Sequence, residues 1–122
     1  MSKIRSHRDL IVWQKAMQLA VQIYRLTERF PPSEMYCLTS QITRAAVSVP
    51  ANIAEGYARS ASRDYARFLA IAKGSLMETE TFLLLSVELG YLSDDQASQA
   101  LGLVSEIDKM LTVLRSKIVA SS

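Results

Sequence analysis

Residues 48–67, SVPANIAEGYARSASRDYAR, decide the fold, because one long helix must end and the next must begin within them. Pro50 and Gly56 interrupt a stretch whose flanks have helical periodicity. A proline lacks a backbone donor and crowds the carbonyl four residues earlier, so we predict a kink near Pro50 rather than a break. Three arginines then follow at four-residue intervals: Arg59, Arg63 and Arg67.

Apolar residues recur at helical spacing on both sides of this stretch. The pattern predicts helices over about 10–30, 33–59, 62–89 and from 93 onward. Prolines separate the first two, and Gly90 is suited to end the third in a left-handed conformation. Ser93 with Gln96 has the spacing of a capping box for the fourth.

Short connections join antiparallel helices, and no segment alternates as a strand does. We therefore predict an all-α fold, an antiparallel up-down-up-down four-helix bundle. It forms a single domain over residues 1–122, with residues 1–7 as a mobile basic arm. The expected core is given by the apolar stripes: Trp13, Leu19, Ile23, Ile42, Phe68, Leu76, Leu83, Val104 and Leu111.

The composition narrows the class of protein. Charged residues interrupt every apolar run before the ~20 residues that a membrane span needs. The basic N-terminal sequence lacks the apolar run of a secretory signal, so we expect a cytoplasmic protein without a membrane partner. The one cysteine, Cys37, cannot form an intramolecular disulfide, and its helical context suggests a packing role.

Charge is unevenly distributed although the net charge is only +2. Residues 1–73 carry 11 Lys and Arg against 5 Asp and Glu, and residues 74–122 carry 3 against 7. Antiparallel helices gather the basic residues at one pole. The candidate nucleic-acid-binding residues there are Arg5, Arg8, Arg59, Arg63, Arg67, Arg115 and Lys117, with Lys3 beside them.

Helix-end electrostatics explain only part of this pole. A cation is favourable near a helix C-terminus and unfavourable near an N-terminus. Four arginines lie at predicted N-terminal ends: Arg5, Arg8, Arg63 and Arg67. Solvation, contact with a neighbouring subunit or binding of phosphate would each account for them. No group of aromatic residues is evident beside them, so base-specific recognition is not expected.

The sequence offers no catalytic centre or cofactor site. Its only histidine, His7, cannot supply the Glu-x-x-His pairs of a di-metal bundle, a serine or cysteine triad, or a zinc site. We therefore predict a protein that is not an enzyme and holds no metal or cofactor.

A second group of residues near the kink has two interpretations. Asn52 and Gly56 fall on or beside the inward face of their helix, and Glu55 precedes Arg59 by four residues, the favourable order for an ion pair. Asn52 could fix the helix register, and Gly56 could allow close approach, as could Gly74. The alternative is that these residues contact a ligand.

The runs DLIVWQKAMQLAVQIY, FPPSEMYCLTSQITRAAVSVPANIAEGYARS and YARFLAIAKGSLMETETFLLL closely resemble the four-helix-bundle family named for open reading frames inside intervening sequences of bacterial 23S ribosomal RNA genes. The resemblance covers about residues 9–93. It implies a left-handed bundle assembled as a homopentamer, and kinship with the accessory bundle protein of diversity-generating retroelements. That relative is thought to bind nucleic acid and to partner a reverse transcriptase. Typical family positions here include Arg44, Asn52, Glu55, Gly56 and Gly74.

Two functions follow as hypotheses. The first is an oligomer that binds the backbone of RNA or DNA through the basic pole. The second is a scaffold or adaptor for a partner protein, with no nucleic-acid role. The exposed apolar residues expected around the first helix favour a homo-oligomer in either case.

Overall fold

Four α-helices and two short 3-10 helices form the part of the chain that the structure, a computed structural model, describes, which is residues 3–121. The 3-10 helices are η1 (His7–Asp9) and η2 (Pro32–Glu34). The α-helices are α1 (Ile11–Thr27), α2 (Leu38–Tyr57), α3 (Ser62–Glu88) and α4 (Asp94–Ala120). No strand occurs among the described residues, which confirms the predicted all-α fold.

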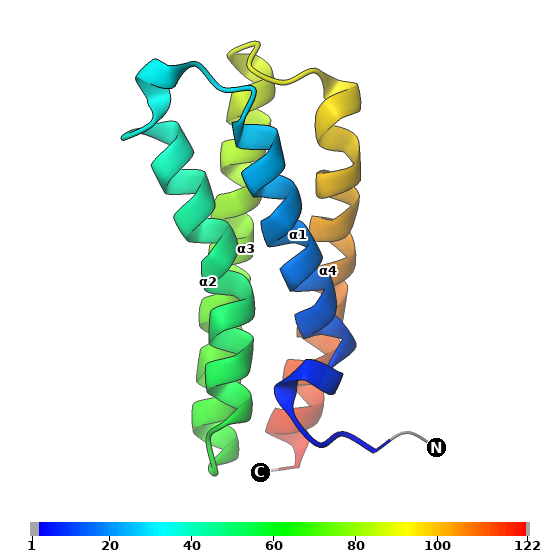
Figure 1. Ribbon diagram of the computed structural model, residues 1–122. Coiled ribbons are helices and arrows are strands. Elements are labelled where there is room, and N and C mark those ends of the chain that lie inside the picture. Colours follow the sequence, from blue (N-terminus) through cyan, green and yellow to red (C-terminus); the bar gives the residue numbers. More distant parts are fainter. Residues whose placement is uncertain (1–2, 122) are drawn as a thin grey trace.

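The helices lie side by side, and the chain runs up α1, down α2, up α3 and down α4 (Figure 1). Each helix contacts the next in sequence, and α1 contacts α4 to close the bundle. The contact between α2 and α3 is the most extensive. Within residues 3–121, no helix is long and apolar enough to cross a membrane.

The connection between α3 and α4 follows the predicted signals. Gly90 has a φ of 79°, so it adopts the left-handed conformation expected of it. The Tyr91 N–H donates to the Ser86 carbonyl at 2.9 Å and the Gly90 N–H to the Val87 carbonyl at 3.0 Å, the bonds of a Schellman motif. Ser93 and Gln96 form the predicted capping box at the start of α4.

The start of the second helix differs from the prediction. The α-helix begins at Leu38 rather than near residue 33, because the η2 turn and residues 35–37 intervene. Met35 is therefore exposed instead of facing the core, and Cys37 is exposed rather than packed. A carboxylate oxygen of Glu34 lies 3.4 Å from the Leu38 N–H. This contact takes the place of the missing side-chain cap.

Pro50 lies inside α2 without breaking it, as predicted. The two halves of α2 are inclined to each other in Figure 1, in the manner expected of an internal proline. Pro50 is buried, so its ring replaces the missing hydrogen bond with apolar packing.

The core runs along the interior of all four helices. Seven of the nine residues predicted for it are buried, from Leu19 on α1 to Leu111 on α4. The other two, Trp13 and Phe68, are only half buried. Trp13 packs edge-on against His7, with ring centroids 5.1 Å apart, and Phe68 lies beneath two arginines. Both rings therefore lie at the edge of the core.

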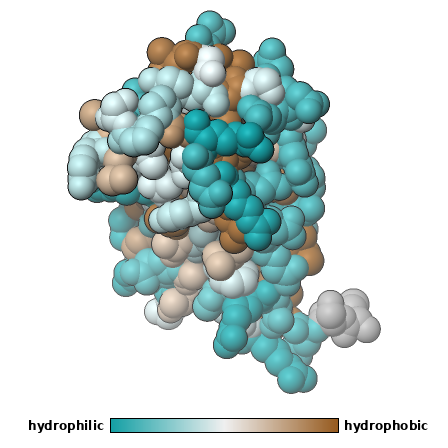
Figure 2. Space-filling view, turned by 45° about the horizontal axis from the view of Figure 1, so that its top comes forward, coloured by the Kyte–Doolittle hydropathy of each residue, from teal (hydrophilic) through white to brown (hydrophobic). Residues whose placement is uncertain are grey.

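Charge and hydropathy vary along the bundle. The pole at which α1 joins α2 and α3 joins α4 carries acidic residues such as Glu34 and Asp94, and Figure 2 turns that pole toward the viewer. Hydrophilic side chains alternate there with separate hydrophobic patches. The hydroxyl of Tyr91 donates to Glu34 at 2.7 Å, which ties the two connections together and raises the pKa of Tyr91. The basic residues discussed below lie near the opposite pole.

Candidate nucleic-acid interface

Gly56 brings the end of α2 against the start of α3. A Cβ atom at this position would lie 2.9 Å from the Phe68 Cβ and 3.2 Å from the Tyr65 carbonyl oxygen. Atoms at such distances overlap, so only glycine permits this approach of the two helices. The prediction of close packing at Gly56 is confirmed. The same prediction for Gly74 is wrong, because no atom lies within 4 Å of the corresponding position and the residue is exposed.

Aromatic rings gather where the two helices meet. The rings of Tyr57 and Tyr65 pack edge-on with centroids 6.2 Å apart. The pKa of the Tyr65 hydroxyl is raised, first by burial and then by the neighbouring Tyr57. The Phe68 ring lies on the same turns of α3. Aromatic rings therefore do lie beside the arginines, although all three are partly buried rather than displayed as an open platform.

Two arginines share the Phe68 ring. The guanidinium carbon of Arg59 lies 4.8 Å from the ring centroid and that of Arg67 lies 4.5 Å from it. Arg59 also pairs with Glu55 at 3.5 Å, as its spacing predicted, and Arg67 pairs with Asp64 at 3.8 Å. These ion pairs are long and largely exposed, so they hold the arginines weakly.

Two further arginines complete the group. Arg63 is exposed on the first turn of α3, with no ion pair to any described residue. Arg115 reaches from α4 to α3, where its Nε donates to the Ala66 carbonyl at 3.2 Å. We refer to four residues as the basic surface: Arg59, Arg63, Arg67 and Arg115. It surrounds the first turns of α3 and displays four cations beside the carboxylates of Glu55 and Asp64.

Three further candidate residues, Arg5, Arg8 and Lys117, lie outside the basic surface as defined above. Arg5 precedes η1 and Arg8 lies within it, and η1 contacts α1 and α2 among the described elements. The side chain of Asp9 caps this turn by accepting from the backbone N–H of Arg5 at 2.8 Å. Lys117 faces α1 instead and lines an apolar groove. Lys117 therefore borders a different groove from Arg115, although both lie near the end of α4.

Asn52 and Arg44 lie near a polar link between α2 and α3. The Asn52 amide nitrogen donates to the Ser48 carbonyl and hydroxyl oxygens, each at 2.8 Å. The Ser75 hydroxyl donates to the Ser48 hydroxyl at 2.8 Å, which links the two helices. The Ser48–Ser75 bond fixes the register of the two helices, and Asn52 contributes to it indirectly by bonding to Ser48. Arg44 is exposed beside the network, where it lines a shallow polar groove together with Glu78.

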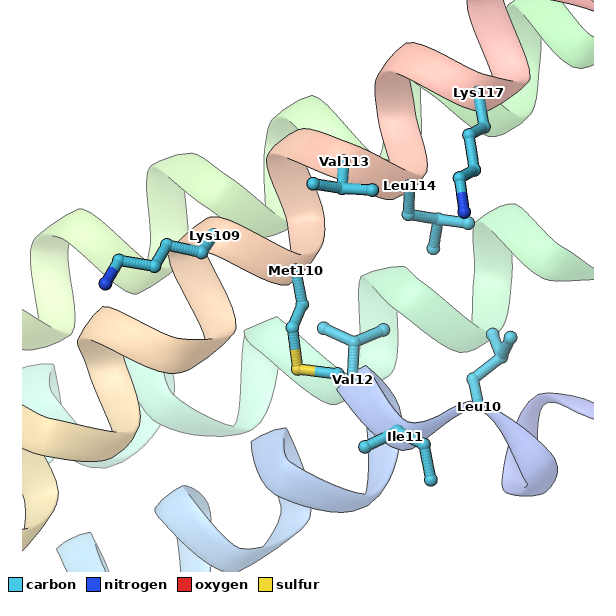
Figure 3. Close-up of a pocket in the computed structure, with 8 residues that line it drawn as sticks. All are labelled: Leu10, Ile11, Val12, Lys109, Met110, Val113, Leu114 and Lys117. Atoms are coloured by element: carbon cyan, nitrogen blue, oxygen red, sulfur yellow. The ribbon is translucent and has the colours of Figure 1, made fainter.

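An apolar groove of about 360 Å³ lies on the other side of the bundle, between the start of α1 and the second half of α4. Ile11 and Val113 are both about half exposed there, at 52% and 54%. Lys109 and Lys117 flank Val113 and Leu114 along α4 (Figure 3). Exposed apolar side chains between cations are suited to contact with another protein.

Sequence reasoning found the arginines but missed the aromatic residues around them. Tyr65 and Phe68 are three residues apart and so share a side of α3, which is a usable signal. Tyr57 joins them only because Gly56 fixes how closely the helices approach. Among the described residues, no group of three or more histidine, cysteine, aspartate and glutamate side chains is placed to hold a metal ion.

The sequence and the fold of this chain are similar to those of known proteins. The family model described as 23S rRNA-intervening sequence protein matches residues 8–113. A crystal structure at 1.70 Å of a protein with unknown function from the S23 ribosomal protein family of Bacteroides thetaiotaomicron superposes with a TM-score of 0.78. The two chains are 27% identical over 86% of this chain and 98% of the other. No curated protein matches the sequence.

Proposed function

The chain belongs to the 23S rRNA-intervening sequence protein family, and we propose that this member is a non-catalytic oligomer that binds the backbone of RNA or DNA through its basic surface. The observation that carries the proposal is the grouping of four guanidinium groups around the first turns of α3. Arginine suits phosphate because its planar fork donates two parallel hydrogen bonds to neighbouring oxygens.

The position of these arginines favours an anionic ligand over a purely structural role. Arg63 and Arg67 lie in the first turns of α3, where the helix dipole disfavours cations. Repulsion among the arginines of the basic surface is offset by two carboxylates, Glu55 beside Arg59 and Asp64 beside Arg67, and both ion pairs are exposed. A bound phosphate would neutralise this excess and accept from the arginines, and each phosphate contact would release counterions.

The test uses charge-neutral variants at the two ends of the bundle. Arg63→Gln combined with Arg67→Gln removes two cations of the basic surface. Arg25→Gln combined with Arg29→Gln removes two exposed arginines near the acidic pole, as a matched control. Binding of a labelled RNA is followed by fluorescence anisotropy over a range of salt concentrations. We expect the first variant to bind weakly and its log K against log salt slope to be shallower by roughly 0.7–0.9 per lost contact.

Equal binding by both variants and the parent at every salt concentration would refute the role of the basic surface. Equal weakening by both variants would show that overall charge, rather than this surface, governs the affinity.

Self-assembly is the second part of the proposal. Apolar residues remain exposed along α1 after the bundle has formed, among them Met17, Val21 and Tyr24 at 41%, 45% and 54%. Contact with a second copy would remove them from water. The family resemblance implies five copies. Light scattering should therefore give several times the monomer mass at micromolar concentration, and a monomer mass would contradict the proposal.

The alternative function is that of an adaptor for a partner protein. It is favoured by the apolar groove between α1 and α4, whose flanking lysines would suit an acidic amphipathic helix. Purification without nuclease distinguishes the two functions. Co-purifying nucleic acid, visible as excess absorbance at the nucleic-acid maximum, supports backbone binding, whereas its absence favours the adaptor.

A further inference from the structure

A groove between α3 and α4 continues from the basic surface and shares Arg115 with it. It lies about one turn beyond Arg67 along α3 and has a volume of about 370 Å³. Its floor is apolar, formed by Leu69, Ala70 and Leu111, of which Ala70 alone is exposed. Its rim is polar and basic, formed by Lys73, Thr112 and Arg115.

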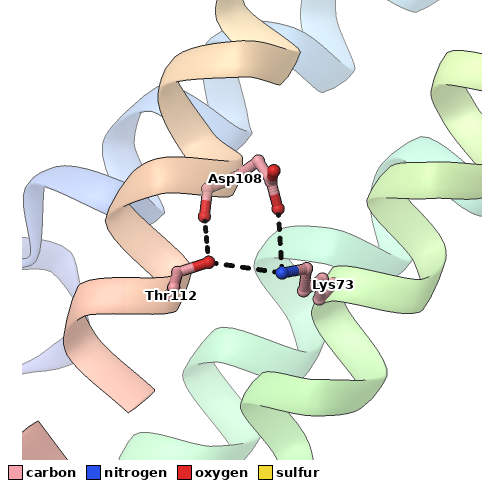
Figure 4. A network of polar contacts seen from close by, with 3 residues as sticks. All are labelled: Lys73, Asp108 and Thr112. Carbon is pink, nitrogen blue, oxygen red and sulfur yellow. Dashed lines mark hydrogen bonds and ion pairs between the residues drawn. The ribbon is translucent and has the colours of Figure 1, made fainter. Parts of the chain in front are cut away.

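The rim supplies two cations that can each donate to a ligand. Arg115 uses only its Nε for the bond to the Ala66 carbonyl, so its terminal nitrogens remain available. Lys73 lies 3.4 Å from a carboxylate oxygen of Asp108 and 3.3 Å from the Thr112 hydroxyl (Figure 4). The contact with Asp108 lacks hydrogen-bond geometry, since that buried oxygen has no hydrogen-bond partner among the described residues.

The charge balance of the groove favours an anion. Lys73 and Arg115 contribute two positive charges, and Asp108 contributes one negative charge. The ammonium group of Lys73, whose side chain is 45% exposed, has three donors, so it can donate to a ligand while it stays beside Asp108.

We propose that this groove holds one unstacked nucleotide of a single-stranded nucleic acid, with the base on the apolar floor and a phosphate between Arg115 and Lys73. The inference rests on the proposed function and specifies its ligand. A base within a duplex is paired and stacked, so it cannot reach the floor, whereas a single strand can turn its bases outward. The basic surface alone would bind both forms of nucleic acid.

The experiment blocks the floor without changing any charge. Ala70 is exposed, so Ala70→Phe fills the groove from α3 without disturbing the core. Ser116→Phe, also at an exposed lining position, fills it from α4 and serves as a second variant. Ala51→Phe is the control, because Ala51 is exposed on α2, which does not contact α4. Circular dichroism establishes that each variant folds.

The probes are a short labelled oligouridylate and an RNA duplex of the same length. We expect the parent to prefer the single strand, and each groove-filling variant to lose roughly tenfold in affinity for it, because the added ring excludes the base from the groove. Affinity for the duplex and the salt slope should stay unchanged, as should all properties of Ala51→Phe.

The outcomes separate this inference from the function on which it rests. If the parent binds RNA but both groove-filling variants retain its affinity for the single strand, the groove does not hold a nucleotide and backbone binding stands. If the parent binds neither probe, the proposed function fails and the nucleotide site fails with it.

Discussion

The close approach of α2 to α3 at Gly56 positions the basic surface. The variant Gly56→Ala tests whether this approach requires a glycine. The added methyl group would lie 2.9 Å from the Phe68 Cβ, 3.1 Å from a ring carbon of Tyr65 and 3.2 Å from the Tyr65 carbonyl oxygen. Two of these atoms belong to the α3 backbone or are attached directly to it. Relief of the overlap therefore requires the two helices to move apart.

Two opposing contributions set the size of the effect. Overpacking of this kind costs about 1–3 kcal/mol. Replacing a helical glycine by alanine gains up to ~1 kcal/mol, and less at Gly56, which lies one residue before the end of α2. We expect a net loss of about 1 kcal/mol in the free energy of unfolding. At a urea m-value of about 2 kcal/mol/M, this loss lowers the denaturation midpoint by roughly 0.5 M.

Gly74→Ala is the matched control, because Gly74 lies in the middle of α3 with open space around it. Only the difference in helix propensity between glycine and alanine applies there, so the free energy of unfolding should rise by about 0.5–1 kcal/mol. Urea unfolding followed by circular dichroism, at one fixed protein concentration, compares the two. The reasoning is refuted if Gly56→Ala stabilises the protein as much as Gly74→Ala does.

Three further predictions follow from burial and polar contacts. Leu76→Ala, at a fully buried position, should cost about 2–5 kcal/mol in chemical denaturation, whereas Leu84→Ala, exposed on the same helix, should cost well under half as much. Lys73→Met should destabilise the fold by leaving the buried Asp108 oxygen uncompensated, and adding Asp108→Asn should recover most of the loss; independent, additive effects in this double-mutant cycle would contradict the pairing. Because the pKa of Tyr65 is raised in the folded state, stability should be unaffected below about pH 10 and should fall as the pH rises through the folded value. Tyr65→Phe should reduce that fall in denaturation measured at increasing pH, and an undiminished fall would show that Tyr65 is not its source.

The parts of the fold set by local signals could be predicted from the sequence. Gly90 and the Ser93 capping box act on their own neighbours, so the connection between α3 and α4 was correctly placed. The start of α2 could not be placed in this way. It depends on Glu34, whose carboxylate contacts both the Leu38 N–H and the hydroxyl of Tyr91, far away in the sequence.

Periodicity gives the direction of a side chain but not its depth. Trp13 and Phe68 fall on apolar faces, yet they lie at the edge of the core and are only partly buried. The same limit applies to the site. The arginine spacing marked the start of α3, but the stacking of Arg59 and Arg67 on Phe68 depends on a helix separation that Gly56 determines in three dimensions.

The salt dependence of RNA binding by the unmodified protein tests the central claim most directly. If the four arginines of the basic surface contact phosphates, log K should fall linearly with log salt, with a slope of roughly −2 to −3 for a single strand. Fluorescence anisotropy with a labelled oligouridylate gives this slope. Absence of binding at low salt, or an affinity that does not change with salt concentration, would contradict the account.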